Sequence, residues 1–205
     1  MKKNIMVVDL DRCIGCKACQ VACKMENGVA LGSSRIKVLA IGPTGTYPDL
    51  EMYFLPVMCQ HCEEPPCVKV CPTGASYIRN EDGLVLVEKE KCIGCKSCLR
   101  ACPYEANLFN NEMRVSDKCT LCEHLQAEGE LPACVKICAG SALIFGDIND
   151  PESKVSLAIE AAGPENVHSL REFGNKPAVR YILRKAKWFD VLPQECEELK
   201  GRRRS

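Results

Sequence analysis

Short apolar runs, separated by polar and turn-forming residues, dominate the pattern along this chain. Runs rich in Val, Ile, Leu and Tyr and bounded by Gly, Pro, Asn or Asp are typical of β-strands. They predict strands at residues 5–8, 35–40, 51–57, 76–79, 84–87 and 142–145. We expect the first and the last of these strands to lie in the same unit of the fold.

The residues between neighbouring strands predict two hairpins. The turn sequence NEDG separates the strands at 76–79 and 84–87, which indicates a compact hairpin. The Gly- and Pro-rich sequence GPTGTYPD separates the strands at 35–40 and 51–57 and predicts a turn there. The second hairpin would be a longer excursion from the rest of the chain.

Two helices are predicted towards the C-terminus. Residues 151–162 form the first, with Pro151 near its start and Gly163 after its end. Residues 193–200 form a short second helix that Gly201 would end. The sequence between them, NKPAVRYILRKAKWF, mixes apolar and basic residues, and it fits either contact with a partner subunit or packing on the chain's own core.

Composition changes this picture through one residue type. The chain has 205 residues, enough for one compact domain or two small ones, but only 5% are aromatic and 17 are cysteines. Something other than a hydrophobic core must therefore help to hold the chain. Cysteine-rich chains are either disulfide frameworks, which belong to exported proteins, or metal proteins.

The N-terminal sequence favours metal over disulfides. Its apolar run at residues 5–8 is too short for a secretory signal, and Asp9 and Asp11 follow at once. We expect no signal peptide, twin-arginine signal or membrane span of the chain's own. Synthesis in the reducing cytoplasm is then expected, with the chain staying there or reaching the membrane or periplasm together with an exported partner.

Sixteen of the cysteines fall into four groups of four. Groups I and III share the spacing C-x2-C-x2-C-x3-C, and only Cys196 stays outside the groups, as an expected free surface thiol. In chain order, group I is Cys13, Cys16, Cys19 and Cys23; group II is Cys59, Cys62, Cys67 and Cys71; group III is Cys92, Cys95, Cys98 and Cys102; and group IV is Cys119, Cys122, Cys134 and Cys138.

The spacing of groups I and III is the bacterial ferredoxin run that binds [4Fe–4S] clusters. Three thiolates on a tight loop reach three corners of one cube, and Gly15 and Gly94 let the loop curl without side chains blocking the sulfides. The fourth cysteine is expected to begin the next helix and to point elsewhere. Zinc is the alternative for groups II and IV, but in groups I and III a third cysteine would add a ligand to a complete pair. The sequence therefore predicts four [4Fe–4S] clusters and sixteen iron ligands.

The groups must pair, because the fourth cysteine of such a run binds the neighbouring cluster. Either I joins II and III joins IV, or II and III pair inside I and IV. The compact hairpin between groups II and III favours the nested pairing. It predicts four ligand sets: Cys13, Cys16, Cys19 with Cys138; Cys119, Cys122, Cys134 with Cys23; Cys59, Cys62, Cys67 with Cys102; and Cys92, Cys95, Cys98 with Cys71.

The expected fold class is α+β, with two pseudo-symmetric ferredoxin-like two-cluster units nested in sequence, short β-hairpins and a C-terminal extension. The predicted divisions are an outer unit at 1–24 plus 104–150, a hairpin insertion at 25–58, an inner unit at 59–103, and a partner-contacting extension at 151–205.

Charge argues against nucleic-acid binding. The formal net charge is zero, with 27 basic and 27 acidic residues, and no basic face stands out. With thiolate ligands and four cubane cores the balance would be about −8. The basic run at residues 202–204 is expected to be a solvated tail, with contact to a partner or an anionic membrane as the minority interpretation.

The order of the groups and several phrases resemble one known family. The phrases ACKMEN, CQHCEEPPCVKVCPTGASY, DGLVLVEKEKCIGC, ACPYEA, KCTLCEH, PACVKIC and FGDINDPES are similar to the four-cluster ferredoxin-like beta subunit of the dimethyl-sulfoxide reductase superfamily. Within it, the chain most resembles the polysulfide and thiosulfate reductase branch, closely over about residues 5–151. Some relatives lose one cysteine of group III and hold a three-iron cluster, whereas this chain keeps all four. Groups I and IV are followed by Lys24 and Ala139 instead of proline, which is not a ligand.

The resemblance implies an electron-transfer subunit that does no bond chemistry itself. A molybdopterin catalytic subunit would dock near the cluster of Cys13, and a membrane quinol-oxidising subunit near the cluster of Cys92. The alternatives are an electron-transfer subunit of a soluble formate dehydrogenase or hydrogenase complex, or a free-standing multi-cluster ferredoxin. No nucleophile–base pair, phosphate-binding loop or flavin fingerprint is present, so no catalytic site is expected in the chain.

Several polar residues lie next to the cysteines. His61 could donate to a cluster ligand, but packing or backbone bonding is favoured, and His124 and His168 are weaker candidates. Four lysines flank cluster cysteines, where a positive charge would raise a cluster's potential; ordinary solvated lysines are the alternative. These are Lys17, Lys24, Lys96 and Lys118.

Overall fold

A computed structural model describes residues 2–195 of the chain. Its largest sheet has four strands in the order β8-β1-β10-β9. At its centre, β1 (Asn4–Asp9) pairs antiparallel with β8 (Leu143–Asp147) and parallel with β10 (Arg180–Ile182), which in turn pairs with β9 (Val167–His168). The expected neighbourhood of residues 5–8 and 142–145 is confirmed by the register Met6 to Phe145.

Both faces of β1 are covered, so all six of its residues are buried. Met6 and Val8 point into the main core, while Ile5 and Val7 pack under helix α6 (Lys154–Ala162), against Val155. Because side chains alternate across a strand, one apolar run supplies both layers.

Helix α6 starts later than the sequence suggests. The prediction of a start at residue 151 was wrong, because Ser153 is the N-cap and its side chain accepts a hydrogen bond from the Ser156 amide. The predicted end is confirmed, since Gly163 caps the helix with a positive φ. A short 3₁₀ turn, η2 (Pro164–Asn166), then leads into β9.

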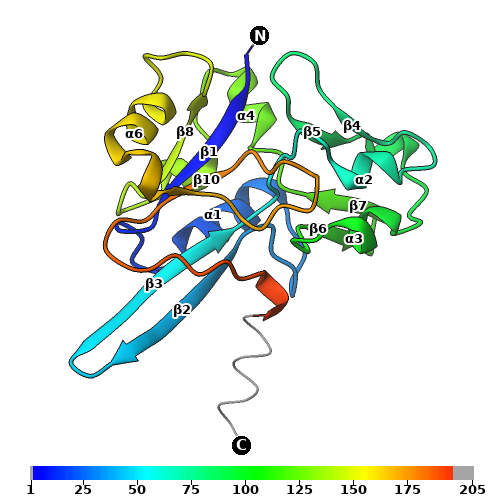
Figure 1. Cartoon of the computed structure of the whole chain (residues 1–205). Helices are drawn as coiled ribbons and strands as arrows, with labels where there is room; N and C mark the ends of the chain where they lie inside the picture. The colour runs from blue at the N-terminus through cyan, green and yellow to red at the C-terminus, as the bar shows by residue number, and fades with distance from the viewer. Residues whose placement is uncertain (1, 196–205) are drawn as a thin grey trace, which may run out of the picture.

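The second part of the molecule consists of two hairpins and two short helices. The hairpin predicted around NEDG is confirmed as β4 (Ser76–Ile78) and β5 (Val85–Val87). A second hairpin, β6 (Asn107–Asn110) and β7 (Val115–Lys118), was not predicted, because its strands carry too few apolar residues. Together with α2 (Pro66–Lys69), η1 (Lys89–Lys91) and α3 (Ser97–Ala101), these elements lie on the opposite side from α6 (Figure 1).

The hairpin of β2 (Lys37–Thr46) and β3 (Asp49–Val57) projects from the body as a two-stranded arm (Figure 1). The prediction of a long turn at 42–49 was wrong, because pairing resumes at Thr44–Glu51 after a register shift that follows Ile41. A bulge absorbs Gly42 and Pro43 without ending the strand. The base of the arm joins the core through Leu55 and Val57, whereas its tip is exposed.

Three further helices flank the cysteine groups, and they are α1 (Ala18–Asn27), α4 (Glu123–Ala127) and α5 (Ala133–Lys136).

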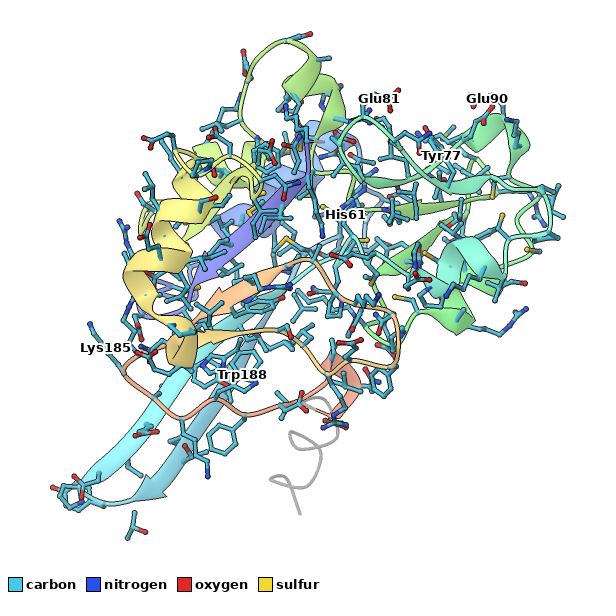
Figure 2. The ribbon with its side chains drawn as sticks, turned by 45° about the horizontal axis from the view of Figure 1, so that its top comes forward. His61, Tyr77, Glu81, Glu90, Lys185 and Trp188 are labelled. Carbon is cyan, nitrogen blue, oxygen red and sulfur yellow. The ribbon has the colours of Figure 1, made fainter. Side chains whose placement is uncertain are left out.

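The last described segment returns across the core. Trp188 stacks on His168 and lies near Tyr53 and Tyr181 (Figure 2). Of the two alternatives for the sequence NKPAVRYILRKAKWF, packing on the chain's own core therefore applies to β10 and Trp188.

Most of the second predicted helix, with Cys196 and the basic run at 202–204, lies outside the described residues. The described part is a mixed α/β molecule of small, mostly antiparallel sheets. None of its helices has the length and apolar character needed to cross a membrane.

Candidate iron–sulfur sites

Cys13, Cys16, Cys19 and Cys138 surround one pocket, which we call set 1. The loop before α1 curls through left-handed backbone at Gly15 and Lys17. A Cβ on Gly15 would lie 2.5 Å from the ring of Phe54. Glycine is therefore required by the close approach of β3, and not only to leave room for the sulfides. Burial, followed by the neighbouring Cys13 sulfur, raises the pKa of Cys19 to about 11.

Cys23, Cys119, Cys122 and Cys134 form set 2, and all four are buried. Burial raises the pKa of Cys134 well above its ordinary value, and the sulfurs of Cys119, Cys122 and Cys23 raise it further. The amide nitrogen of Asn27 lies 3.8 Å from Sγ of both Cys23 and Cys122.

A buried ion pair orients that amide. Arg35 donates to both carboxylate oxygens of Asp117, at 2.5 and 3.0 Å, and to Asn27 Oδ1 at 2.7 Å. The guanidinium therefore fixes which end of the Asn27 amide faces the sulfurs. Sequence spacing gives no sign of this network, because Arg35 and Asp117 are 82 positions apart.

Cys59, Cys62, Cys67 and Cys102 form set 3. Burial, followed by the sulfur of Cys59, raises the pKa of Cys67 to about 12. Two buried side chains contact this set. Lys118 Nζ lies 3.4 Å from Cys59 Sγ, and Asn175 donates its amide to Cys62 Sγ at 3.1 Å.

Cys71, Cys92, Cys95 and Cys98 surround a second pocket and form set 4. Ser116 contacts the set twice: its amide donates to Cys92 Sγ at 3.4 Å, and its Oγ lies 3.2 Å from Cys98 Sγ. The Ser76 amide donates to Cys71 Sγ at 3.4 Å. Such bonds stabilise thiolates and influence cluster potentials.

Each group thus contributes three cysteines to one set and the fourth to another. The expectation that the fourth cysteine begins the next helix was wrong. Helix α1 begins at Ala18, before Cys19, so that Cys23 lies within it, and α3 ends just before Cys102. The third cysteine is therefore the one at the helix start, where it still faces the loop that carries the first two.

The chemistry of these sets fits iron–sulfur clusters. All sixteen cysteines among the described residues are free. Within residues 2–195, no three His, Cys, Asp or Glu side chains lie close enough together to hold a single metal ion. Burial raises the pKa of eight of these thiols, and a cationic cluster core would deprotonate them as ligands.

His61 lies buried in the middle of the molecule (Figure 2). Its Nδ1 accepts a hydrogen bond from the Val85 amide at 3.1 Å, so the favoured backbone-bonding interpretation is confirmed. Burial, with the nearby Lys118, holds the pKa of His61 well below its ordinary value. His124 instead pairs with Glu26 at the surface, 2.9 Å apart.

Comparison with known proteins places the chain among iron–sulfur proteins. The 4Fe-4S dicluster domain family matches residues 50–148, and a second 4Fe-4S dicluster domain family matches residues 12–75. Two dicluster domains correspond to four [4Fe–4S] clusters and sixteen cysteines.

Three relatives each match most of this chain. A sulfite dehydrogenase subunit of Allochromatium vinosum is 40% identical, over 95% of this chain and 89% of its own length. A tetrathionate reductase subunit of Salmonella typhimurium is 42% identical, over 86% and 71% respectively. The thiosulfate reductase electron transfer subunit of Salmonella typhi is 47% identical, over 72% and 78%.

All three are named as subunits of oxidoreductases, and the thiosulfate reductase protein is named as an electron transfer subunit. These names agree with a subunit that holds four clusters and is not itself catalytic. The chain belongs to the four-cluster, ferredoxin-like [4Fe–4S] beta subunits of the dimethyl-sulfoxide reductase superfamily, in the branch that includes the polysulfide and thiosulfate reductases.

Proposed function

We propose that the four cysteine sets bind the clusters in a linear order, 1-2-3-4, and that electrons enter and leave at sets 1 and 4. One observation carries this proposal: Cys16 of set 1 and Cys95 of set 4 are the exposed cysteines among the described residues, whereas sets 2 and 3 have none. Each bound cluster would supply a one-electron carrier. The chain holds the two middle carriers away from water and leaves the two end carriers accessible to partners.

Contacts between the sets support the order. Cys19 of set 1 interacts electrostatically with Cys134 of set 2, and Cys59 of set 3 with Cys119 of set 2. Cys67 of set 3 and Cys98 of set 4 pack around Val85. These neighbours support the nested ligand assignment, with an outer unit of residues 1–24 and 104–150, an inner unit of 59–103, a hairpin insertion at 25–58 and an extension at 151–205.

Apolar residues mark both ends for partner contact. Ile14, between Cys13 and Cys16, is 65% exposed, and Ile93, between Cys92 and Cys95, is 68% exposed. Exposed apolar side chains beside a redox centre favour docking that excludes water from the transfer path. The catalytic partner, a molybdopterin subunit, docks at set 1, and a quinol-oxidising membrane partner docks at set 4.

The relatives suggest the reaction of the catalytic partner. Their names refer to sulfite, tetrathionate and thiosulfate, which are all sulfur oxyanions. The complex proposed here is a respiratory reductase of polysulfide or thiosulfate type, associated with the membrane through its partner. The competing assignments are a soluble formate dehydrogenase or hydrogenase complex, and a free-standing ferredoxin.

Anaerobic purification of the native complex tests these assignments. We expect about sixteen irons per chain, four per cubane, together with a large molybdopterin subunit and a membrane subunit. Co-purification with a hydrogenase or formate dehydrogenase without detergent would support the second assignment, and a stable lone chain the third. About four zinc ions per chain, with no iron, would overturn the cluster proposal itself.

A further inference from the structure

Lys118 is buried where set 2 and set 3 meet. It is the last residue of β7 and is 2% exposed. Its ammonium contacts Sγ of Cys59 at 3.4 Å, the carbonyl of Cys119 at 3.0 Å and the carbonyl of Val85. An ammonium has three N–H donors, so each has an acceptor.

No carboxylate balances this charge in the part of the chain that the structure describes, where Lys118 belongs to no ion pair. The neighbouring Asp117 is paired with Arg35. An isolated buried cation is costly unless a negative group compensates it. As a ligand of the cluster, Cys59, which Lys118 contacts, would be a thiolate and would provide that negative charge.

The other lysines beside cluster cysteines differ from Lys118. Lys17 and Lys96 are exposed, and Lys96 lies over the ring of Phe109. Lys24 donates to the carbonyls of Ala30 and Ser33. Water screens the charges of exposed lysines, whereas the charge of Lys118 acts in a water-excluded interior. The charge of Arg35, near set 2, is instead balanced by the carboxylate of Asp117.

We propose that Lys118 raises the reduction potential of the cluster held by set 3. At the junction between sets 2 and 3, the electron is then favoured on the cluster of set 3. The inference rests on the proposed function, in which Cys59, Cys62, Cys67 and Cys102 are ligands. Transfer across the junction moves one electron from the cluster of set 3, which is oxidised by one unit, to that of set 2, which is reduced by one. No proton moves and no bond forms. The cation stabilises the extra negative charge of the reduced state.

The test uses the full chain in its native complex, with an anaerobic redox titration followed by electron paramagnetic resonance. Lys118→Met removes the charge. We expect one of the four midpoint potentials to fall by at least the equivalent of a tenfold change in the reduction equilibrium, about 59 mV for one electron. Lys118→Gln keeps a donor for the carbonyls and should shift the same signal in the same direction. Cys102→Ser identifies which signal belongs to set 3.

Lys96→Met is the matched control, because it removes a charge near Cys95 that water already screens, and we expect no such shift. Sixteen irons with unchanged potentials in both Lys118 variants would overturn the inference and leave the proposed function standing. Loss of iron in both Lys118 variants, with the parent and Lys96→Met fully loaded, would also overturn it, because Lys118 would then be needed for assembly. A parent complex without iron would instead overturn the proposed function.

Discussion

The side-chain amide of Asn175 donates a hydrogen bond to Cys62 Sγ at 3.1 Å, although the two residues are 113 positions apart. The same amide contacts the Tyr104 hydroxyl, 2.9 Å away, and Asn175 Oδ1 accepts from the Phe173 amide at 2.9 Å. A segment with no cysteine ligand of its own among the described residues thus reaches a predicted ligand in the middle of the molecule. The C-terminal segment is therefore part of the environment of set 3.

Asn175→Leu should destabilise this region. The change leaves the partly buried Phe173 amide without its acceptor and removes the buried hydrogen bonds to the Tyr104 hydroxyl and to Cys62. Together these losses should cost about 1–3 kcal/mol in the free energy of unfolding. Without the donor to Cys62, set 3 should also lose iron to a chelator faster than in the parent protein. Thermal unfolding and timed iron release measure the two effects. Asn111→Leu at the exposed tip of the β6–β7 hairpin is the control, and equal effects in the two variants would contradict the assignment.

Cys102→Ser should alter the cluster of set 3 and leave that of set 4 in place. Cys102 follows the other cysteines of group III in sequence, yet its sulfur interacts with those of Cys62 and Cys67. Iron analysis and electron paramagnetic resonance of the variant should report one changed cluster. Cys71→Ser is the reciprocal variant and should change the cluster of set 4. If Cys102→Ser removed only the set 4 signal, the nested ligand assignment would be wrong.

Gly94→Ala should be more damaging than the same change at Gly129. Both glycines have positive φ, +69° and +77°, where a side chain costs about 1–2 kcal/mol. A Cβ on Gly94 would also lie 2.5 Å from the Arg114 carbonyl, whereas one on Gly129 meets nothing within 4 Å. We expect Gly94→Ala to lose about one cluster, four of sixteen irons, and Gly129→Ala to keep full iron. Equal iron content would show that the β6–β7 hairpin yields to the new methyl group.

Arg35→Met should cost about 3–5 kcal/mol, because it leaves the carboxylate of Asp117 mostly buried without its partner. The side chains of Arg35 and Asp117 are only 7% and 16% exposed. The change also frees the Asn27 amide, which alters the surroundings of set 2. The electron paramagnetic resonance spectrum of the cluster held by set 2 should therefore change. Lys69→Met is the control: the side chains of Lys69 and its partner Glu64 are 60% and 47% exposed, and we expect no measurable change in stability. A similar result for Arg35→Met would mean that water reaches Asp117.

Local sequence was sufficient wherever the structure depends on neighbouring residues. The turn NEDG predicted the β4–β5 hairpin, and Gly163 predicted the end of α6, because turn and cap preferences are properties of a few adjacent residues. The spacing of groups I and III likewise predicted [4Fe–4S] clusters, since three thiolates on one loop reach one cube.

Sequence failed where distant segments decide the outcome. The arm strands continue through GPTGTYPD because each pairs with the other beyond a bulge, which turn preferences alone do not reveal. The strands of the β6–β7 hairpin have few apolar residues, so periodicity did not identify them. Strand β10 belongs to the central sheet only because β1 offers it a free edge 173 positions earlier, at Val7–Arg180.

The sequence by itself determined the type of cofactor, the family and the main hairpins, because cysteine spacing and turn chemistry are local. Only the tertiary structure decided which side chains surround each set. Lys118 is one of four lysines beside cysteines, and nothing local distinguishes it from Lys96. Its burial comes from the packing of β5, β7 and Cys59 around it, and the strength of its charge depends on the exclusion of water, a property of the folded whole.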